Sequence, residues 1–242
     1  MNNNLVCLFR ACNLEVSTNS IKNISRPDFF SKQRCFKSFY NSFGNKENVD
    51  IIVVFDGKSE DELVCYIKKF NVKDIIYLNN IGNKESLIFC YNLAEKLNFD
   101  FVFFAEDDYL YLSNSYEIMM EGLESFGKQD QFITLYDHYN RYLPPNITGD
   151  VTTGHDYCLI TKSTHWRSSD STTGSVAMTK ELFNKIKYRL LFHNIHDCAF
   201  YREMLGKGYR VFNCIPGKST HINKVYASPL INWVKYNNSI IL

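Results

Sequence analysis

The stretch Phe101-Val-Phe-Phe-Ala-Glu-Asp-Asp-Tyr-Leu-Tyr-Leu112 places five apolar residues directly before three carboxylates. The apolar run is typical of a strand buried on both faces, as in a parallel sheet. A carboxylate buried there without a partner would cost several kcal/mol, so the acids are predicted to lie where the strand leaves the sheet. In open α/β sheets, ligands bind at this carboxyl edge.

Glu106, Asp107 and Asp108 repel one another unless a cation joins them. Oxygen ligands favour a hard divalent ion, so the triplet predicts a Mg²⁺ or Mn²⁺ site. A solvated acidic turn is the alternative for the triplet taken alone. The apolar runs on both sides favour the metal site.

Short apolar runs alternate with amphipathic segments upstream of the triplet. The predicted strands are 5–9, 50–55, 74–78 and 101–105, and the predicted helices are 27–44, 59–70 and 87–97. Pro27 suits a first helical turn, and Ser59 with Glu62 forms a capping-box pattern. The β-α-β order predicts an α/β fold, a three-layer α/β/α sandwich with a mainly parallel, Rossmann-like central sheet.

Two common nucleotide-binding motifs are absent from the sequence. No Gly-x-Gly-x-x-Gly turn follows the first strand, and no Gly-Lys-Ser/Thr phosphate loop occurs. Their absence argues against a dinucleotide oxidoreductase and against a P-loop enzyme.

The pattern is less regular after residue 113. Helices are predicted at 116–126, at 179–186 with Thr179 as its cap, and at 195–205; strands are predicted at 132–136, 157–161, 175–178 and 210–215. The polar stretch 163–174 is predicted as a loop. We expect one domain, 1–242, with a nucleotide-binding half at about 1–112 and an acceptor-binding half at about 113–242.

Composition indicates an ordinary globular protein. The 242 residues are 45% hydrophobic and 22% charged, and the net charge of +1 gives no general attraction to nucleic acid or anionic membranes. The eight cysteines include no Cys-x-x-Cys pair, so reduced and mostly buried thiols are expected. Neither a signal peptide nor an apolar run near the ~20 residues of a membrane span is evident, which predicts a cytoplasmic location.

The element order and four sequence segments resemble the GT-A glycosyltransferases, in particular small bacterial and viral members. The segments are Gly82-Asn-Lys-Glu-Ser-Leu87, Asn92-Leu-Ala-Glu-Lys96, Glu106-Asp-Asp-Tyr-Leu110 and the late Ser219-Thr-His221. In this family an Asp-x-Asp motif holds a metal on the donor diphosphate, and here Glu106 replaces its first Asp. The resemblance implies a metal-dependent, inverting transfer of sugar from a UDP- or GDP-sugar to a hydroxyl acceptor such as a glycan.

The same resemblance implies roles for residues at the donor side. Asp108 and His221 would bind Mn²⁺ or Mg²⁺, and Glu106 would bind the ribose or a metal-bound water. The other expected donor-binding residues are Arg10, Asp56, Lys84 and Asp107. A structural histidine, a turn aspartate before Gly57 and a surface ion pair are the alternatives for His221, Asp56 and Arg10.

The acceptor side needs a general base and a sugar-binding surface. Asp197 stands at a predicted helix start, where an anion is favoured, and is the expected base, with Asp170 and Asp156 as alternatives. The expected acceptor-binding residues are His165, Trp166, Arg167 and Asp170. Trp166 would equally suit the core.

Three alternative functions remain open from the sequence. The acids could serve nucleotidyl or other phosphoryl transfer, the chain could be an inactive nucleotide-sugar-binding module, or the protein could be purely structural. Pyrophosphate or phosphate release without sugar transfer would favour the first, and binding without turnover the second.

Overall fold

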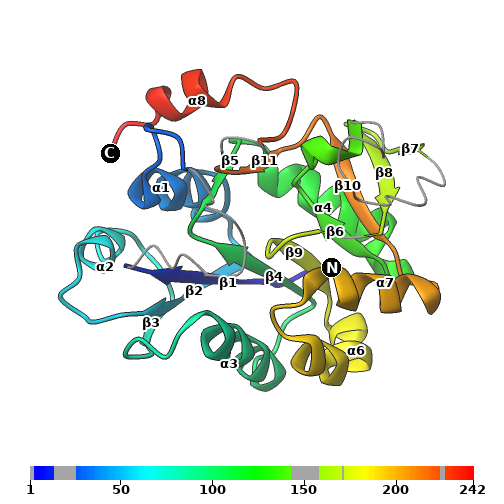
Figure 1. Ribbon diagram of the computed structural model, residues 1–242, viewed down its shortest axis with the longest axis horizontal. Helices are drawn as coiled ribbons and strands as arrows, with labels where there is room; N and C mark the ends of the chain where they lie inside the picture. Colours follow the sequence, from blue (N-terminus) through cyan, green and yellow to red (C-terminus); the bar gives the residue numbers. More distant parts are fainter. Residues whose placement is uncertain (1–2, 14–25, 143–157, 171, 224–226) are drawn as a thin grey trace.

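A nine-stranded mixed sheet forms the centre of the described part of the chain, which comprises residues 3–13, 26–142, 158–170, 172–223 and 227–242 of the computed structural model (Figure 1). Its strand order is β3-β2-β1-β4-β9-β6-β10-β8-β7, and a second small sheet pairs β5 with β11. The strands are β1 (Leu5–Cys12), β2 (Val49–Asp56), β3 (Asp74–Tyr77), β4 (Phe101–Glu106), β5 (Tyr109–Tyr111), β6 (Phe132–Thr134), β7 (Cys158–Ile160), β8 (His165–Ser169), β9 (Val176–Thr179), β10 (Val211–Ile215) and β11 (Ser219–His221). The helices are α1 (Lys32–Phe43), α2 (Glu62–Ile67), α3 (Asn83–Lys96), α4 (Ser115–Ser125), α6 (Lys180–His193), α7 (Asp197–Gly206) and α8 (Trp233–Ser239), with short 3₁₀ turns η1 (Gly127–Gln129) and η2 (Tyr139–Tyr142).

The first half of the sheet is parallel. Strand β1 pairs in parallel with β2 on one side and with β4 on the other, and β2 pairs in parallel with β3. The helices that connect these strands return the chain across the sheet, so all four strands end at the same edge. The predicted α/β, Rossmann-like fold is confirmed.

The second half of the sheet is mixed. Strand β9 runs antiparallel to β4 and β6, while β10 is parallel to β6 and antiparallel to β8. Because β9 runs opposite to both neighbours, β6 and β10 point the same way as β4. Their carboxyl ends therefore lie at the same edge as those of the first four strands.

Two hydrophobic layers cover the faces of the sheet. Alternate residues of β1, such as Leu5 and Phe9, pack against α1, α2 and α4, whereas Val6 and Leu8 pack with α3, α6 and α7 (Figure 1). This alternation is the two-residue period of a strand that is buried on both faces.

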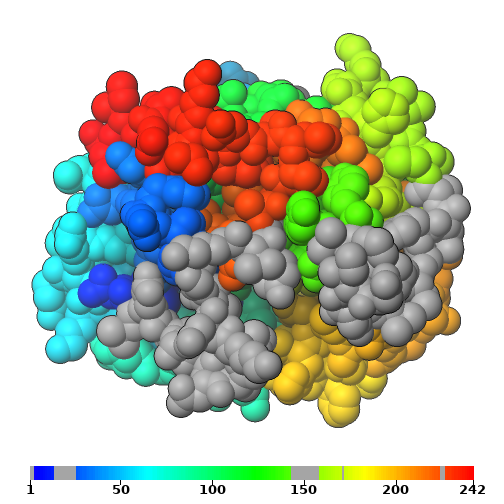
Figure 2. All heavy atoms as spheres, turned by 45° about the horizontal axis from the view of Figure 1, so that its top comes forward, coloured from blue at the N-terminus to red at the C-terminus, as the bar shows by residue number. Residues whose placement is uncertain are grey.

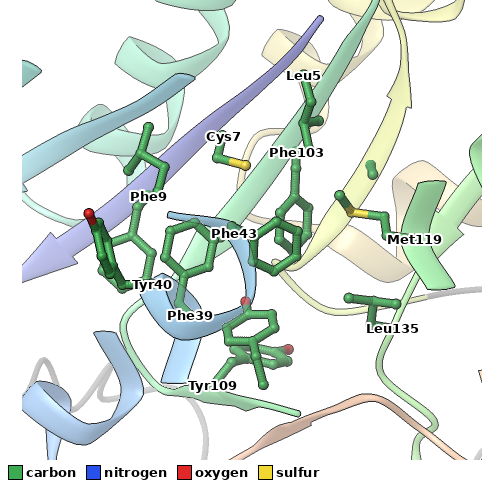
Figure 3. Packing of buried hydrophobic residues seen from close by; sticks show 14 of the residues in the cluster. Leu5, Cys7, Phe9, Phe39, Tyr40, Phe43, Phe103, Tyr109, Met119 and Leu135 are labelled. Atoms are coloured by element: carbon green, nitrogen blue, oxygen red, sulfur yellow. The ribbon is translucent and has the colours of Figure 1, made fainter. Parts of the chain in front are cut away.

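Aromatic side chains fill the layer on the α1 side (Figure 3). The Phe39 ring lies 4.8 Å from Phe9 and 5.0 Å from Phe43 between centroids, and Phe43 lies 5.4 Å from Phe103. Burying each such side chain contributes roughly 1.5–3 kcal/mol. This layer fixes α1 against the strands that carry the acidic triplet.

The C-terminal segment packs on the outer side of this layer. Trp233 and Ile240 join Leu110 of β5 and Ile222, which follows β11, in a third apolar cluster. Figure 2 shows the C-terminal residues spread along α1 on one face of the molecule. The small β5–β11 sheet is thereby fixed beside the end of β4.

Several predicted boundaries need correction. Helix α1 begins at Lys32 with the Ser31 hydroxyl accepting from Arg34 N, so Pro27 lies outside it. Helix α2 begins at Glu62 after Asp61 and makes no side-chain cap hydrogen bond, so the capping box was wrong. Thr179 does cap α6, but that helix continues to His193.

Two broader expectations from the sequence have mixed outcomes. Cys7, Cys35, Cys90 and Cys214 are buried, while three of the other cysteines are exposed, so burial holds for half of the eight. None of the helices in the described part of the chain has the length and apolar character needed to cross a membrane.

Candidate functional site

The carboxyl ends of β1, β2 and β4 bring five of the predicted residues to one edge of the sheet. In the strand register, Arg10 lies beside Glu106 and Cys12 beside Asp56. Asp107 and Asp108 follow Glu106 in the turn between β4 and β5. The acidic triplet therefore lies at the edge where the apolar strand leaves the sheet.

Arg10 and Glu106 form an ion pair at this edge. Arg10 Nη1 also donates to Asn83 Oδ1 at 2.5 Å and to Ser86 Oγ at 3.2 Å, which ties β1 to the first turn of α3. Burial opposes the Arg10 charge, but the Glu106 carboxylate outweighs it and the pKa of Arg10 rises above its usual range. Arg10 is therefore a permanent cation in the site.

Asp107 turns toward α1 rather than toward solvent. Its Oδ2 accepts from Cys12 N at 2.8 Å and lies 2.9 Å from Lys32 Nζ. Burial raises the pKa of Asp107 although the Lys32 charge opposes the rise. Both contacts join the end of β1 to the start of α1, which is a positioning role.

Asp108 meets His221 and a residue that the sequence analysis did not select, Arg26. Asp108 Oδ2 accepts from Arg26 Nη2 at 2.7 Å and from His221 Nε2 at 2.9 Å. Burial alone would raise the pKa of Asp108, but His221 and then Arg26 hold it well below its usual range. Asp108 is therefore an anion, and its other oxygen, Oδ1, is buried with no hydrogen-bond partner among the described residues.

The Asp108–His221 pair brings together a carboxylate oxygen and an imidazole nitrogen, two ligand types that divalent ions accept. No group of three or more His, Cys, Asp or Glu side chains among the described residues could hold an ion. The pair fits an ion completed by water and phosphate oxygens, as Mg²⁺ commonly is.

Asp56 holds the loop before α3. Its two carboxylate oxygens accept from Ile81 N and Gly82 N, each at 2.7 Å. Gly82 has φ +97°, a conformation that favours glycine. Both oxygens are thus used inside the protein, while Lys84 is exposed in the first turn of α3.

Asp197 is the first residue of α7 and lies near Glu106. Gly174 N donates to its carboxylate, and a Cβ on Gly174 would lie 1.7 Å from Glu106 Oε2, so Gly174 separates the two acids. Burial and then the Glu106 charge raise the pKa of Asp197 to about 7. A carboxyl group that titrates near neutral pH suits a general base or acid.

The predicted acceptor residues lie on and after β8, a strand that replaces the expected loop 163–174. Trp166 is fully buried, its Nε1 donates to Thr161 Oγ1 at 2.8 Å, and its ring packs edge-on to Phe126. A ring in the core cannot offer a face to a sugar, so the platform interpretation needs correction. His165 is exposed at the start of the strand.

Arg167 and Asp170 belong to a buried polar network. Arg167 pairs with Asp137, which also accepts from Asn213 Nδ2 at 3.0 Å, and Asp170 lies 3.4 Å from Arg141. These contacts tie Arg167 of β8, and Asp170 just after it, to other buried side chains of the protein. Asp156 lies outside the described residues.

Three residues near the site were missed from the sequence: Arg26, Lys32 and Asp137. Asp137 follows a predicted strand just as Glu106 does, so the same rule about acids at strand ends could have identified it. Arg26 gives no local signal, because its partner Asp108 is 82 residues away in the chain.

Comparison with known proteins finds similar folds among solved structures. No protein-family model matches the sequence, and no curated protein matches it significantly. The fold is similar to 4-diphosphocytidyl-2C-methyl-D-erythritol synthase from Anaerococcus prevotii DSM 20548, with 11% identity and a TM-score of 0.51 over 98% of this chain and 96% of that chain. It is also similar to a CMP:2-keto-3-deoxy-manno-octonic acid synthetase complexed with CTP, with 14% identity and a TM-score of 0.50 over 88% and 92% of the two chains. A cytidylyltransferase from Leptospira borgpetersenii serovar Hardjo-bovis (strain JB197) gives 14% identity and a TM-score of 0.52 over 98% and 87%.

These similarities overturn the predicted glycosyl transfer. One of the similar structures is named a cytidylyltransferase, another is a synthetase complexed with CTP, and none of the three is named a glycosyltransferase, so the GT-A resemblance extends to the fold alone. The expected sugar transfer from a UDP- or GDP-sugar to a glycan is therefore corrected. The error arose because an acidic strand end and a late histidine do not specify the group that an enzyme transfers.

Proposed function

We propose that this protein is a nucleotidyltransferase that uses a nucleoside triphosphate and a divalent cation, Mg²⁺ or Mn²⁺. It would transfer the nucleoside monophosphate to an oxygen of a second substrate and release pyrophosphate. CTP is the first nucleotide to test, because one protein of similar fold is named a cytidylyltransferase and another is complexed with CTP.

The observation that carries this proposal is the charge pattern at the carboxyl edge of the sheet. The Asp108–His221 pair, with one unpartnered carboxylate oxygen, lies in the same edge as the cationic side chains of Arg10, Arg26 and Lys32. A metal–triphosphate complex needs this combination, since acids bind the ion and cations bind the phosphate oxygens.

The reaction would form one bond and break another at the α-phosphorus. The attacking oxygen bonds to phosphorus, the bridging oxygen leaves with pyrophosphate, and a proton from an attacking hydroxyl passes to the Asp197 carboxylate. Arg10 and Lys32 would bind phosphate oxygens and orient the chain of phosphates. A bound divalent ion would neutralise charge that develops on the leaving group.

Nucleotide binding is the first test. At a hundred times its Kd, CTP with Mg²⁺ should stabilise the protein by ~2.7 kcal/mol, a shift of several degrees in the melting temperature. The shift should disappear in EDTA and in Asp108→Asn. Asp130→Asn, a change in a surface ion pair with Lys185, is the matched control and should keep the shift.

Turnover is the second test. Pyrophosphate release from CTP should depend on a co-substrate drawn from a panel of sugar acids, sugar phosphates and polyol phosphates. Absence of binding by CTP, ATP, GTP and UTP would contradict the proposal. Binding without pyrophosphate release over the whole panel would favour a module that binds nucleotides without catalysis.

A further inference from the structure

Arg26 contacts both Asp108 and His221, the two residues that would hold a divalent ion under the proposed function. Its Nη2 lies 2.7 Å from Asp108 Oδ2, and its Nη1 lies 3.3 Å from His221 Nε2. Nη1 also donates to Ile222 O at 2.6 Å, and the guanidinium stacks on the Phe30 ring at 4.8 Å. A cation that belongs to the chain therefore faces both metal-ligand candidates.

The three contacts of this triangle cannot all be favourable at once. A guanidinium only donates hydrogen bonds, so Arg26 requires a lone pair on His221 Nε2. The contact between the same Nε2 and Asp108 Oδ2 at 2.9 Å requires a proton on that nitrogen. One ring nitrogen cannot provide both, so only one of these two contacts of His221 Nε2 can be a hydrogen bond at a time. A metal ion removes this conflict, because it accepts lone pairs from both the nitrogen and the oxygen.

We propose that Arg26 is an internal substitute for the cation, and that Arg26 and a divalent ion bind the Asp108–His221 pair in a mutually exclusive manner. In the metal-free protein the guanidinium neutralises Asp108 and holds the β5–β11 sheet beside residues 26–30. When the ion binds, Arg26 leaves the carboxylate and becomes available to an anionic group such as a phosphate. The inference deepens the proposed function, on which its phosphate part rests, but the exchange itself needs no nucleotide.

A second arginine in the chain offers a matched control. Arg189 and His193 both contact Glu203 Oε2, so an arginine, a histidine and a carboxylate meet there as well. That cluster lies on α6 and α7, and Lys207 neutralises the other Glu203 oxygen at 2.6 Å. Arg189→Gln therefore removes an arginine from an equivalent triad without changing the proposed site.

Mn²⁺ affinity in the absence of nucleotide tests the exchange. Titration of the full chain by calorimetry, with free Mn²⁺ measured by electron paramagnetic resonance, should give ~10-fold or tighter binding for Arg26→Gln than for the wild type, because a competing charge is removed. Arg26→Lys keeps a cation, so its Mn²⁺ affinity should stay near that of the wild type. The Mn²⁺ affinity of Arg189→Gln should also be unchanged. Adding Asp108→Asn to Arg26→Gln should abolish the gain.

A measurement on the unchanged protein guards against variants that fold poorly. Phenylglyoxal labelling with peptide mass mapping should show Arg26 protected without metal and modified faster with Mn²⁺, while Arg189 reacts equally in both. Three outcomes would each overturn the exchange. The first is a Mn²⁺ affinity in Arg26→Gln that is equal to or weaker than that of the wild type. The others are a gain in Mn²⁺ affinity that persists when Asp108→Asn is added, and a rate of Arg26 labelling that does not change with Mn²⁺. CTP binding is scored separately, so loss of the nucleotidyltransferase proposal would leave these outcomes unchanged.

Discussion

Asp108 Oδ2 lies 2.9 Å from His221 Nε2 although 113 residues separate them in the chain. The ladder between β5 and β11 explains the contact, because it pairs His221 with Tyr109, the residue after Asp108. The geometry of the site thus depends on two short strands outside the main sheet.

Asp108→Asn should weaken Mn²⁺ binding in the presence of CTP by ~10–100-fold, the usual effect of losing a ligand or its supporting contact. The amide keeps the size of the side chain but not its charge. Calorimetric titration checks this, with Glu203→Gln as the control because Glu203 also contacts an arginine and a histidine. Equal weakening in both variants would contradict a specific role for Asp108.

Asp197→Asn should lower the transfer rate by ~10²–10⁴-fold while CTP affinity is kept, since a positioned base contributes about this much. With the pKa of Asp197 at about 7, the wild-type rate should rise with pH and level off above that value. Rate profiles from pH 5 to 9 measure both effects. A wild-type profile that is flat across pH 7 would remove Asp197 as the base.

The same residue should make stability depend on pH. Its pKa is about 7 in the folded protein against 3.8 without the fold, so folding favours the protonated carboxyl. This stabilisation is fully present below pH ~4 and is lost as the pH rises through about 7. Asp197→Asn stays neutral and should melt above the wild type at pH 8 but close to it at pH 4. A melting difference that does not grow with pH would contradict the shifted pKa.

Gly174→Ala should reduce transfer strongly while the protein still folds. A Cβ at Gly174 would lie 1.7 Å from Glu106 Oε2, so Glu106 must move away from Arg10 and Asp197. Gly206→Ala is the control, because a Cβ at the end of α7 meets no atom within 4 Å. Steady-state kinetics and melting curves of both variants test the prediction. Full activity in Gly174→Ala would show that the Glu106 position does not matter.

Trp166→Ala should destabilise the fold by ~3–5 kcal/mol, the range for large aromatic side chains removed from a core. The adjacent His165→Ala should change stability by less than ~0.5 kcal/mol, because His165 is exposed. Urea unfolding of the two variants compares them directly. A small loss in Trp166→Ala would reopen a surface role for the ring.

The first half of the fold could be predicted because its signals are local. Buried parallel strands such as Phe101–Glu106 appear as continuous apolar runs, and their helices carry regular apolar spacing. Strand β8 could not be recognised, since His165–Ser169 is polar and its burial comes from β10 and from contacts such as Arg167 with Asp137. A local sequence pattern does not show which distant segments of the chain will pack against a strand and bury it.

The candidate site likewise has features that local sequence signals predict and features that they do not. The position of Glu106 and Asp108 followed from the end of an apolar strand, and Asp197 followed from a helix start. Whether a residue faces the ligand or the protein could not be predicted in this way. The carboxylate oxygens of Asp56 accept hydrogen bonds from backbone amides, and Asp107 Oδ2 contacts Cys12 N and Lys32. These contacts inside the protein are visible only in the folded structure.

The pairing of β5 with β11 also determines when the site can exist during synthesis. At ribosomal rates, the 113 residues between Asp108 and His221 take roughly 6 to 23 seconds to add. Throughout that interval the parallel strands β1 to β4 are available to fold, but Asp108 has no histidine and no β11 beside it. A newly made chain therefore passes through a stage in which strands β1 to β4 are complete and the contact between Asp108 and His221 is not yet possible.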